Sequence, residues 1–195
     1  MERFGRERRS LAGRKSTAMQ WVAVVFVAIA GVAIVAATKP STFLIERSVT
    51  IDAPPQRVFG LIDDFHHWPR WAPQDRDDKT MQRTFKRAKA GNGAVSEWTS
   101  QGSAGAGTMT MSEVVPLQQV KVVVNWDRPF EAQNINTFTL TPVPQGATTA
   151  TKVTWTVRGS NLYVMKAMEV FLGIDGVIGK HLDEGLRNLK DAAED

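Results

Sequence analysis

Alternating apolar and polar residues recur along this chain from position 45 onward. Ile45, Arg47, Val49 and Ile51 share one side of a segment that Ala53-Pro54-Pro55 ends. A period of two is typical of a half-buried strand. The same alternation, separated by turn residues, predicts six further strands at residues 80–87, 94–101, 108–115, 119–127, 133–141 and 149–158. Their short connections predict antiparallel pairing.

Helical patterns lie on either side of these later strands. After Pro55, apolar residues from Val58 to Ile62 predict a first helix, with Asp52 placed to help cap it, and residues 66–71 predict a short turn limited by Pro69. Near the C-terminus, apolar residues recur at helical spacing over residues 162–192. About thirty residues at roughly 1.5 Å each make a helix of about 45 Å, long enough to cover the apolar face of a sheet. Three glycines, Gly173, Gly176 and Gly179, are expected to bend that helix or to allow close packing.

The N-terminal region has a different pattern. Residues 1–17 are basic and small and are expected to be disordered, residues 18–37 are apolar apart from Gln20, and residues 38–43 form a linker to a domain at 44–192. Twenty apolar residues match the thickness of a bilayer core, so we expect a single-pass inner-membrane anchor, with the basic N-terminus cytoplasmic and the domain on the other side. A cleaved signal peptide, with Val35-Ala36-Ala37 at the cleavage site and secretion as the result, is the alternative.

Charge and cysteine content narrow the functional classes. Residues 1–17 hold six basic and two acidic residues, which accounts for the whole formal charge of +4 and leaves the rest of the chain formally neutral. A neutral domain is not expected to bind nucleic acid. The absence of cysteine excludes a thiol nucleophile and thiolate metal sites.

No motif in the sequence predicts a metal or a cofactor. His66 and His67 adjoin Asp63 and Asp64. Neighbouring helical positions diverge by about 100°, so these side chains do not converge on one point. The glycines from Gly173 to Gly179 follow no strand and therefore do not form a dinucleotide loop. We expect neither a metal nor a cofactor.

The order of elements resembles the helix-grip fold of the START-like, Bet v 1-like (SRPBCC) superfamily, specifically its bacterial polyketide cyclase/dehydrase branch. The resemblance covers residues 44–192 and rests on Ala53-Pro54-Pro55, Trp68-Pro69-Arg70-Trp71, Val153-Thr154-Trp155 and the 179–190 segment. It implies an α+β fold, in which a curved antiparallel sheet of about seven strands surrounds a long C-terminal helix. Members of the superfamily bind lipids, sterols or polyketides, and only some are enzymes, so the fold does not decide the function.

From this fold we expect an apolar pocket between the sheet and the C-terminal helix. The expected lining is Trp68, Trp71, Trp98, Met109, Met111, Val122, Val124, Phe138, Leu140, Trp155, Met168 and Leu172. Trp68 and Trp71 form either a lid or part of the core, and Met109 and Met111 either line the pocket or fill the core. The catalytic candidates are Glu97 and Glu113, since a buried carboxylate can act as a general base.

Three functions remain open at this point. The first is binding of a hydrophobic small molecule or lipid by a membrane-anchored domain. The second is a cyclase or dehydratase that acts on a polyketide-like chain. The third is a filled domain that recruits a protein partner through an exposed apolar patch.

Overall fold

The computed structural model describes residues 20–22, 31, 42–102, 104–146, 148–160 and 175–195. The chain divides into two compact units, and the fold below belongs to the unit formed by Pro40–Leu162 and Gly173–Asp195. Of the predicted anchor at 18–37, only residues 20–22 and 31 are described. None of the described helices combines the length and the hydropathy that crossing a bilayer requires.

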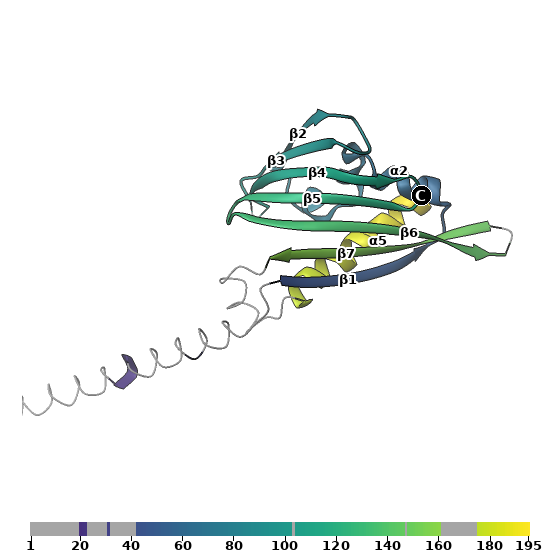
Figure 1. The fold of residues 1–195 in the computed structure, drawn as a ribbon. Helices are drawn as coiled ribbons and strands as arrows, with labels where there is room; N and C mark the ends of the chain where they lie inside the picture. Colours follow the sequence, from purple (N-terminus) through teal and green to yellow (C-terminus); the bar gives the residue numbers. More distant parts are fainter. Residues whose placement is uncertain (1–19, 23–30, 32–41, 103, 147, 161–174) are drawn as a thin grey trace, which may run out of the picture. The chain divides into compact units, whose positions relative to one another are not determined.

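One antiparallel sheet of seven strands dominates this unit, in the order β1-β7-β6-β5-β4-β3-β2 (Figure 1). Each strand after β1 pairs with the next one along the chain, and β7 returns to pair with β1. The strands are β1 (Thr42–Ile51), β2 (Gln82–Arg87), β3 (Ala94–Thr99), β4 (Ala106–Val115), β5 (Gln119–Arg128), β6 (Ala132–Gln145) and β7 (Thr148–Ser160). The predicted α+β class and curved seven-stranded antiparallel sheet are confirmed.

The helices pack against the inner face of this sheet. They are α2 (Pro55–Ile62), the 3-10 helix η1 (Phe65–Arg70), α3 (Pro73–Asp77), the π-helix η2 (Asp175–Gly179) and α5 (Lys180–Glu194). Leu182, Leu186 and Leu189 of α5 are buried against the sheet. The predicted C-terminal helix is therefore present over residues 180–194, while residues 161–174 lie outside the described residues.

Two local expectations are wrong. Asp52 does not cap α2, whose N-cap is Pro54 without a side-chain bond, and the backbone N–H of Asp52 donates instead to Glu194 at 2.7 Å. The charged run from Asp75 to Lys79 is typical of a loop, yet its first three residues belong to the short helix α3, which Pro73 begins. Pro at the first helical position costs no hydrogen bond, because that N–H has no partner within a helix.

Strand β6 continues past Pro142, where the sequence predicts its end. Beyond Thr139 the strand pairs only with β7, with Pro142 opposite Thr151 and Pro144 opposite Thr149. A proline is tolerated on a sheet edge because its missing N–H would have no strand to bond there. The extension forms part of the long β6–β7 hairpin visible in Figure 1.

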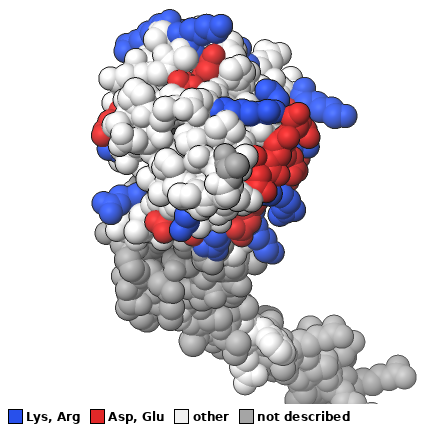
Figure 2. Space-filling model, turned by 90° about the vertical axis from the view of Figure 1, so that its right-hand side faces the viewer, with Lys and Arg blue, Asp and Glu red and all other residues white. Residues whose placement is uncertain are grey.

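The outer surface carries charges of both signs. Figure 2 shows the face at which α5 ends, where lysine, arginine and acidic side chains surround an uncharged centre. Lys190 and Glu194 form one ion pair there, at 2.7 Å. Such exposed pairs contribute about 0–1 kcal/mol, so the fold depends on what lies inside the sheet.

Candidate ligand-binding face

The inner face of the sheet follows from the strand register. Val122 of β5 lies opposite Met111 of β4 and Asn136 of β6, and Asn136 lies opposite Val157 of β7, so these side chains share one face. A β-bulge at Ser112 shifts the alternation, which brings Val114 to the same face. The expected lining residues Met109, Met111, Val122, Val124, Phe138 and Leu140 are all buried there.

Four aromatic rings fill one part of this face. Trp68 and Trp71 of the 65–71 segment pack with Phe138 and Trp155, with ring centroids 4.9–6.0 Å apart. The indole N–H of Trp68 donates to the Ile62 carbonyl at 3.0 Å, and that of Trp71 donates to the Leu61 carbonyl at 2.9 Å. We call these four rings the aromatic cluster. Because both indoles are buried and bonded to the end of α2, they pack η1 onto the sheet rather than forming an exposed lid.

A second aromatic pair lies near the ends of β3 and β5. Trp98 and Trp126 meet edge to face at 5.0 Å, and the indole N–H of Trp98 donates to the Ala104 carbonyl at 2.9 Å. Gly107 makes this arrangement possible, because a Cβ there would lie 2.4 Å from the Trp98 ring. The β3–β4 connection is thus fixed to the inner face.

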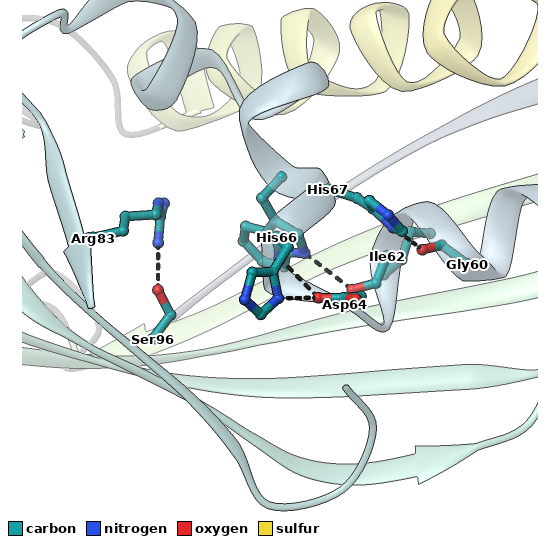
Figure 3. A network of polar contacts seen from close by, with 8 residues as sticks. Gly60, Ile62, Asp64, His66, His67, Arg83 and Ser96 are labelled. Carbon is teal, nitrogen blue, oxygen red and sulfur yellow. Dashed lines mark hydrogen bonds and ion pairs between the residues drawn. The ribbon is translucent and has the colours of Figure 1, made fainter. Parts of the chain in front are cut away.

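Polar groups also face inward, and most have partners. The Asn136 carbonyl oxygen accepts the Trp155 indole N–H at 2.8 Å, and the Asn136 amide donates to Asn134 at 2.9 Å. Arg83 of β2 forms a two-bond ion pair with Asp75 of α3. Its third bond, 2.9 Å long, goes to buried Ser96 (Figure 3). The side chains of Arg83 and Asp75 are only 6% and 4% exposed. This pair fixes α3 to the edge of the sheet.

A second polar group shown in Figure 3 lies on η1. Asp64 accepts from the backbone N–H of His66 at 2.9 Å and approaches the His66 ring at 2.6 Å, while the His67 ring lies 2.7 Å from the Gly60 carbonyl. Burial would raise the pKa of Asp64, but the contacts with His66 outweigh it and hold that pKa below its usual value. The His66 ring stacks on Phe85 at 3.9 Å. These contacts make the group a link between η1 and β2.

His181 of α5 is an interior group that the sequence did not single out as a pocket residue. Its ring meets the Trp155 ring edge to face at 6.4 Å. Burial lowers its pKa below 6.5, against the opposing effects of Glu184 and Asp77, so the ring is neutral at pH 7. Within the described part of the chain, neither ring nitrogen has a hydrogen-bond partner. A neutral imidazole of this kind can donate to a ligand or accept a proton from it.

Gln74 of α3 carries a buried polar atom without a partner. Among the described side chains, its carbonyl oxygen is the one buried polar atom that lacks a hydrogen bond. The sequence pattern could not identify Gln74 as a buried residue, because a glutamine next to the charged residues Asp75 and Arg76 is typical of a protein surface.

The two catalytic candidates face the other way. Glu97 lies opposite Thr84 and Thr108, on the outer face, and pairs with Lys86 at 2.7 Å. Glu113 lies opposite Lys121 and pairs with it there. The structure therefore places neither carboxylate beside the inner face. Of the remaining expected lining residues, Met168 and Leu172 lie outside the described residues.

The sheet end that carries the β3–β4 connection also has an open hollow of about 700 Å³, lined by Thr80, Gln82, Thr99, Ser100, Gln101, Gly102, Gly105, Arg128 and Pro129. Its lining shares no residue with the aromatic cluster. No group of three or more histidine or acidic side chains in the described residues is arranged to hold a metal ion.

Comparisons with known proteins agree with this architecture. Residues 42–194 match the family described as polyketide cyclase / dehydrase and lipid transport. No curated protein matches the sequence. Among solved structures, the chain is similar to the Zhui aromatase/cyclase from Streptomyces sp. R1128, with a TM-score of 0.58 and 13% identity over 78% of this chain and 94% of that one.

Two further solved structures share the fold. The protein XoxI from Bacillus cereus has a TM-score of 0.56 and 17% identity, over 78% of this chain and 96% of that one. A protein from Chromobacterium violaceum has a TM-score of 0.53 and 19% identity, over 80% of this chain and 99% of that one. At these identities the similarity shows the fold.

Proposed function

We propose that this protein, which belongs to the polyketide cyclase / dehydrase and lipid transport family, binds a hydrophobic small molecule or lipid between the inner face of its sheet and its C-terminal helix. One observation carries the proposal: the inner face mixes apolar walls with a few directed polar groups. Val124 and Met109 are buried beside strands that also carry Asn134, Asn136 and Ser96. Ligand sites are typically apolar surfaces with a small number of placed polar groups.

The energetic argument favours an apolar ligand. Burying a methylene contributes about 0.8 kcal/mol, so ten of them contribute about 8 kcal/mol, close to micromolar affinity before ordering costs. Such a ligand needs no charged partner. Among the described residues, the buried pair of Arg83 with Asp75 is already neutralised internally.

The test uses a neutral apolar probe, 2-methylnaphthalene, and the full-length protein. Equilibrium dialysis should show saturable one-to-one uptake above a detergent-matched blank. Val124→Phe and Val124→Trp, which add bulk to the inner face, should weaken uptake. Val123→Trp, the neighbouring position on the outer face, should leave it unchanged. Uptake equal to the blank, in a protein whose circular dichroism shows the native fold, contradicts the proposal.

A second candidate is an enzyme that cyclises or dehydrates a polyketide-like chain. The family description and the aromatase/cyclase similarity support it. The observation that favours it here is the neutral His181 ring, which can take a proton from a carbon next to a carbonyl. His181→Gln should then abolish turnover of a poly-β-ketone while 2-methylnaphthalene still binds. Glu97→Gln and Glu113→Gln, on the outer face, are the matched controls.

We also propose that residues 18–37 hold the domain at the inner membrane, with the N-terminus cytoplasmic. The apolar run and its basic flank support this. Alkaline extraction of cell membranes should leave the full-length protein in the pellet. A soluble product whose N-terminus follows Ala37 would establish signal cleavage and secretion instead.

A further inference from the structure

A buried polar atom without a hydrogen-bond partner lies where α3 meets α5. It is the carbonyl oxygen of Gln74, and α5, which packs on α3, carries the half-buried ring of His181. Both elements meet at this place: Pro73 lies 3.3 Å from where a Cβ of Gly185 would be, and Asp77 acts on His181 electrostatically. We call this place the α3–α5 junction, defined by Gln74, Asp77 and His181.

The surrounding contacts hold Gln74 in position. On one side of it in the sequence, Pro73 packs on α5, and on the other side Asp75 is bound to Arg83 of β2. Gln74 and Asp77 are three residues apart, which places them on one side of a helix, the side on which Asp77 acts on His181. These contacts fix the chain on both sides of Gln74, whose carbonyl oxygen is buried.

A buried oxygen without a hydrogen bond destabilises the folded protein. Leaving a buried acceptor unsatisfied costs about 1–3 kcal/mol, and an apolar residue of the same shape would avoid that cost. The carbonyl oxygen of Gln74 can only accept a hydrogen bond, so its missing partner must carry an O–H or N–H group. The neutral His181 ring, on the helix that α3 packs against, can both donate and accept, which suits a hydroxyl group, and the Trp155 ring 6.4 Å from it offers an aromatic wall.

We infer that the α3–α5 junction binds a hydroxyl group on an otherwise apolar, ring-containing ligand, with Gln74 accepting from that hydroxyl and His181 completing its hydrogen bonding. This inference rests on the proposed function and names the class of ligand within it. A hydroxylated ring compound is bound more tightly than its methyl counterpart, because only the hydroxyl can donate a hydrogen bond to the carbonyl oxygen of Gln74.

The experiment compares two probes of nearly equal shape, 2-naphthol and 2-methylnaphthalene, on the full-length protein. Wild type should bind 2-naphthol about 3- to 10-fold more tightly, the effect of one net hydrogen bond. Gln74→Met and His181→Phe should each reduce that preference towards unity while keeping affinity for 2-methylnaphthalene. Gln82→Met, an exposed glutamine on β2, is the matched control and should keep the preference.

Folding gives an independent measurement. Since Gln74→Met removes an unpaired buried oxygen without changing the length of the side chain, it should raise the urea midpoint of the ligand-free protein. A lowered midpoint means that a bound water already satisfies Gln74, and this overturns the inference.

The remaining outcomes separate the two proposals. If both probes bind equally, or if Gln74→Met keeps the preference, the inference is overturned while the proposed function stands. If neither probe binds, the proposed function is overturned, and the inference with it.

Discussion

The aromatic cluster and the α3–α5 junction lie against the same sheet and differ in how their polar atoms are satisfied. In the cluster, three indole N–H groups, those of Trp68, Trp71 and Trp155, all donate to nearby oxygens within 3.0 Å. In the junction, the buried carbonyl oxygen of Gln74 has no such partner among the described residues. A region whose buried polar atoms are all hydrogen-bonded within the protein is a core. A region that keeps a buried polar atom without a hydrogen bond is a candidate ligand site.

The largest effect should come from the aromatic cluster. Trp71→Ala removes a fully buried ring and should lower the free energy of unfolding by about 3–5 kcal/mol. Urea denaturation measures this. Phe130→Ala, at a side chain 53% exposed, should change it by less than about 0.5 kcal/mol. A Trp71→Ala variant as stable as the Phe130 control would show that the cluster is not the core.

The next effect concerns the buried pair that positions α3. Arg83→Met leaves Asp75 buried without its partner and should cost about 3 kcal/mol of unfolding free energy. The double variant Asp75→Leu, Arg83→Met should recover most of this loss, because no buried charge remains unpaired. Equal losses in the single and double variants would mean that Arg83 contributes through packing alone.

Gly185 tests how closely α5 approaches the aromatic cluster. A Cβ there would lie 2.6 Å from the Trp155 ring, so Gly185→Ala should cost about 1–3 kcal/mol. Gly176→Ala is the matched control, since its Cβ would meet nothing within 4 Å and alanine is the better helix former. In thermal unfolding, Gly185→Ala should lower the Tm and Gly176→Ala should raise it. An unchanged Tm for Gly185→Ala would show that α5 can move away from the sheet.

The smallest effect is a pH dependence at the junction. Burial lowers the pKa of His181 in the folded state, so the stability that its neutral ring contributes is present above about 6.5 and is lost as the pH falls through the folded value. Glu184 and Asp77 oppose the shift and limit its size. Urea midpoints at pH 7.5 and 5.5 should differ less in His181→Gln than in wild type. An unchanged difference would assign the pH dependence to other groups, such as Asp64.

Local patterns predicted the strands well because most strands have one wet and one buried side. Alternation around Val122 and Trp155 follows from exposure alone, and it indicated every strand within a few residues of its observed bounds. The strand continued through Pro142 and the helix began at Pro73 because these prolines lie where the missing N–H has no partner to lose. Such positions depend on the neighbouring strand or helix, which a local pattern does not contain.

The candidate site was predictable only in part. The apolar lining residues from Met109 to Trp155 follow from the same alternation, and the structure buries them. Glu97 and Glu113 were predicted because a carboxylate can act as a general base. The face on which a strand residue lies depends on the register of the strand, and both carboxylates lie on the outer face. Gln74 and His181 carry no sequence signal, since their importance lies in the partners that they lack.

The sequence by itself determined the α+β class, the number of strands, their antiparallel pairing and the apolar side of most of them. All of these depend on short-range periodicity and on turns between neighbours. Only the tertiary structure decided which polar side chains face inward and which of them remain unpaired. Hydrogen bonds between the helices join residues more than a hundred positions apart, such as the one that Asn188 donates to the Trp71 carbonyl at 3.2 Å, and they are settled only when the chain has folded.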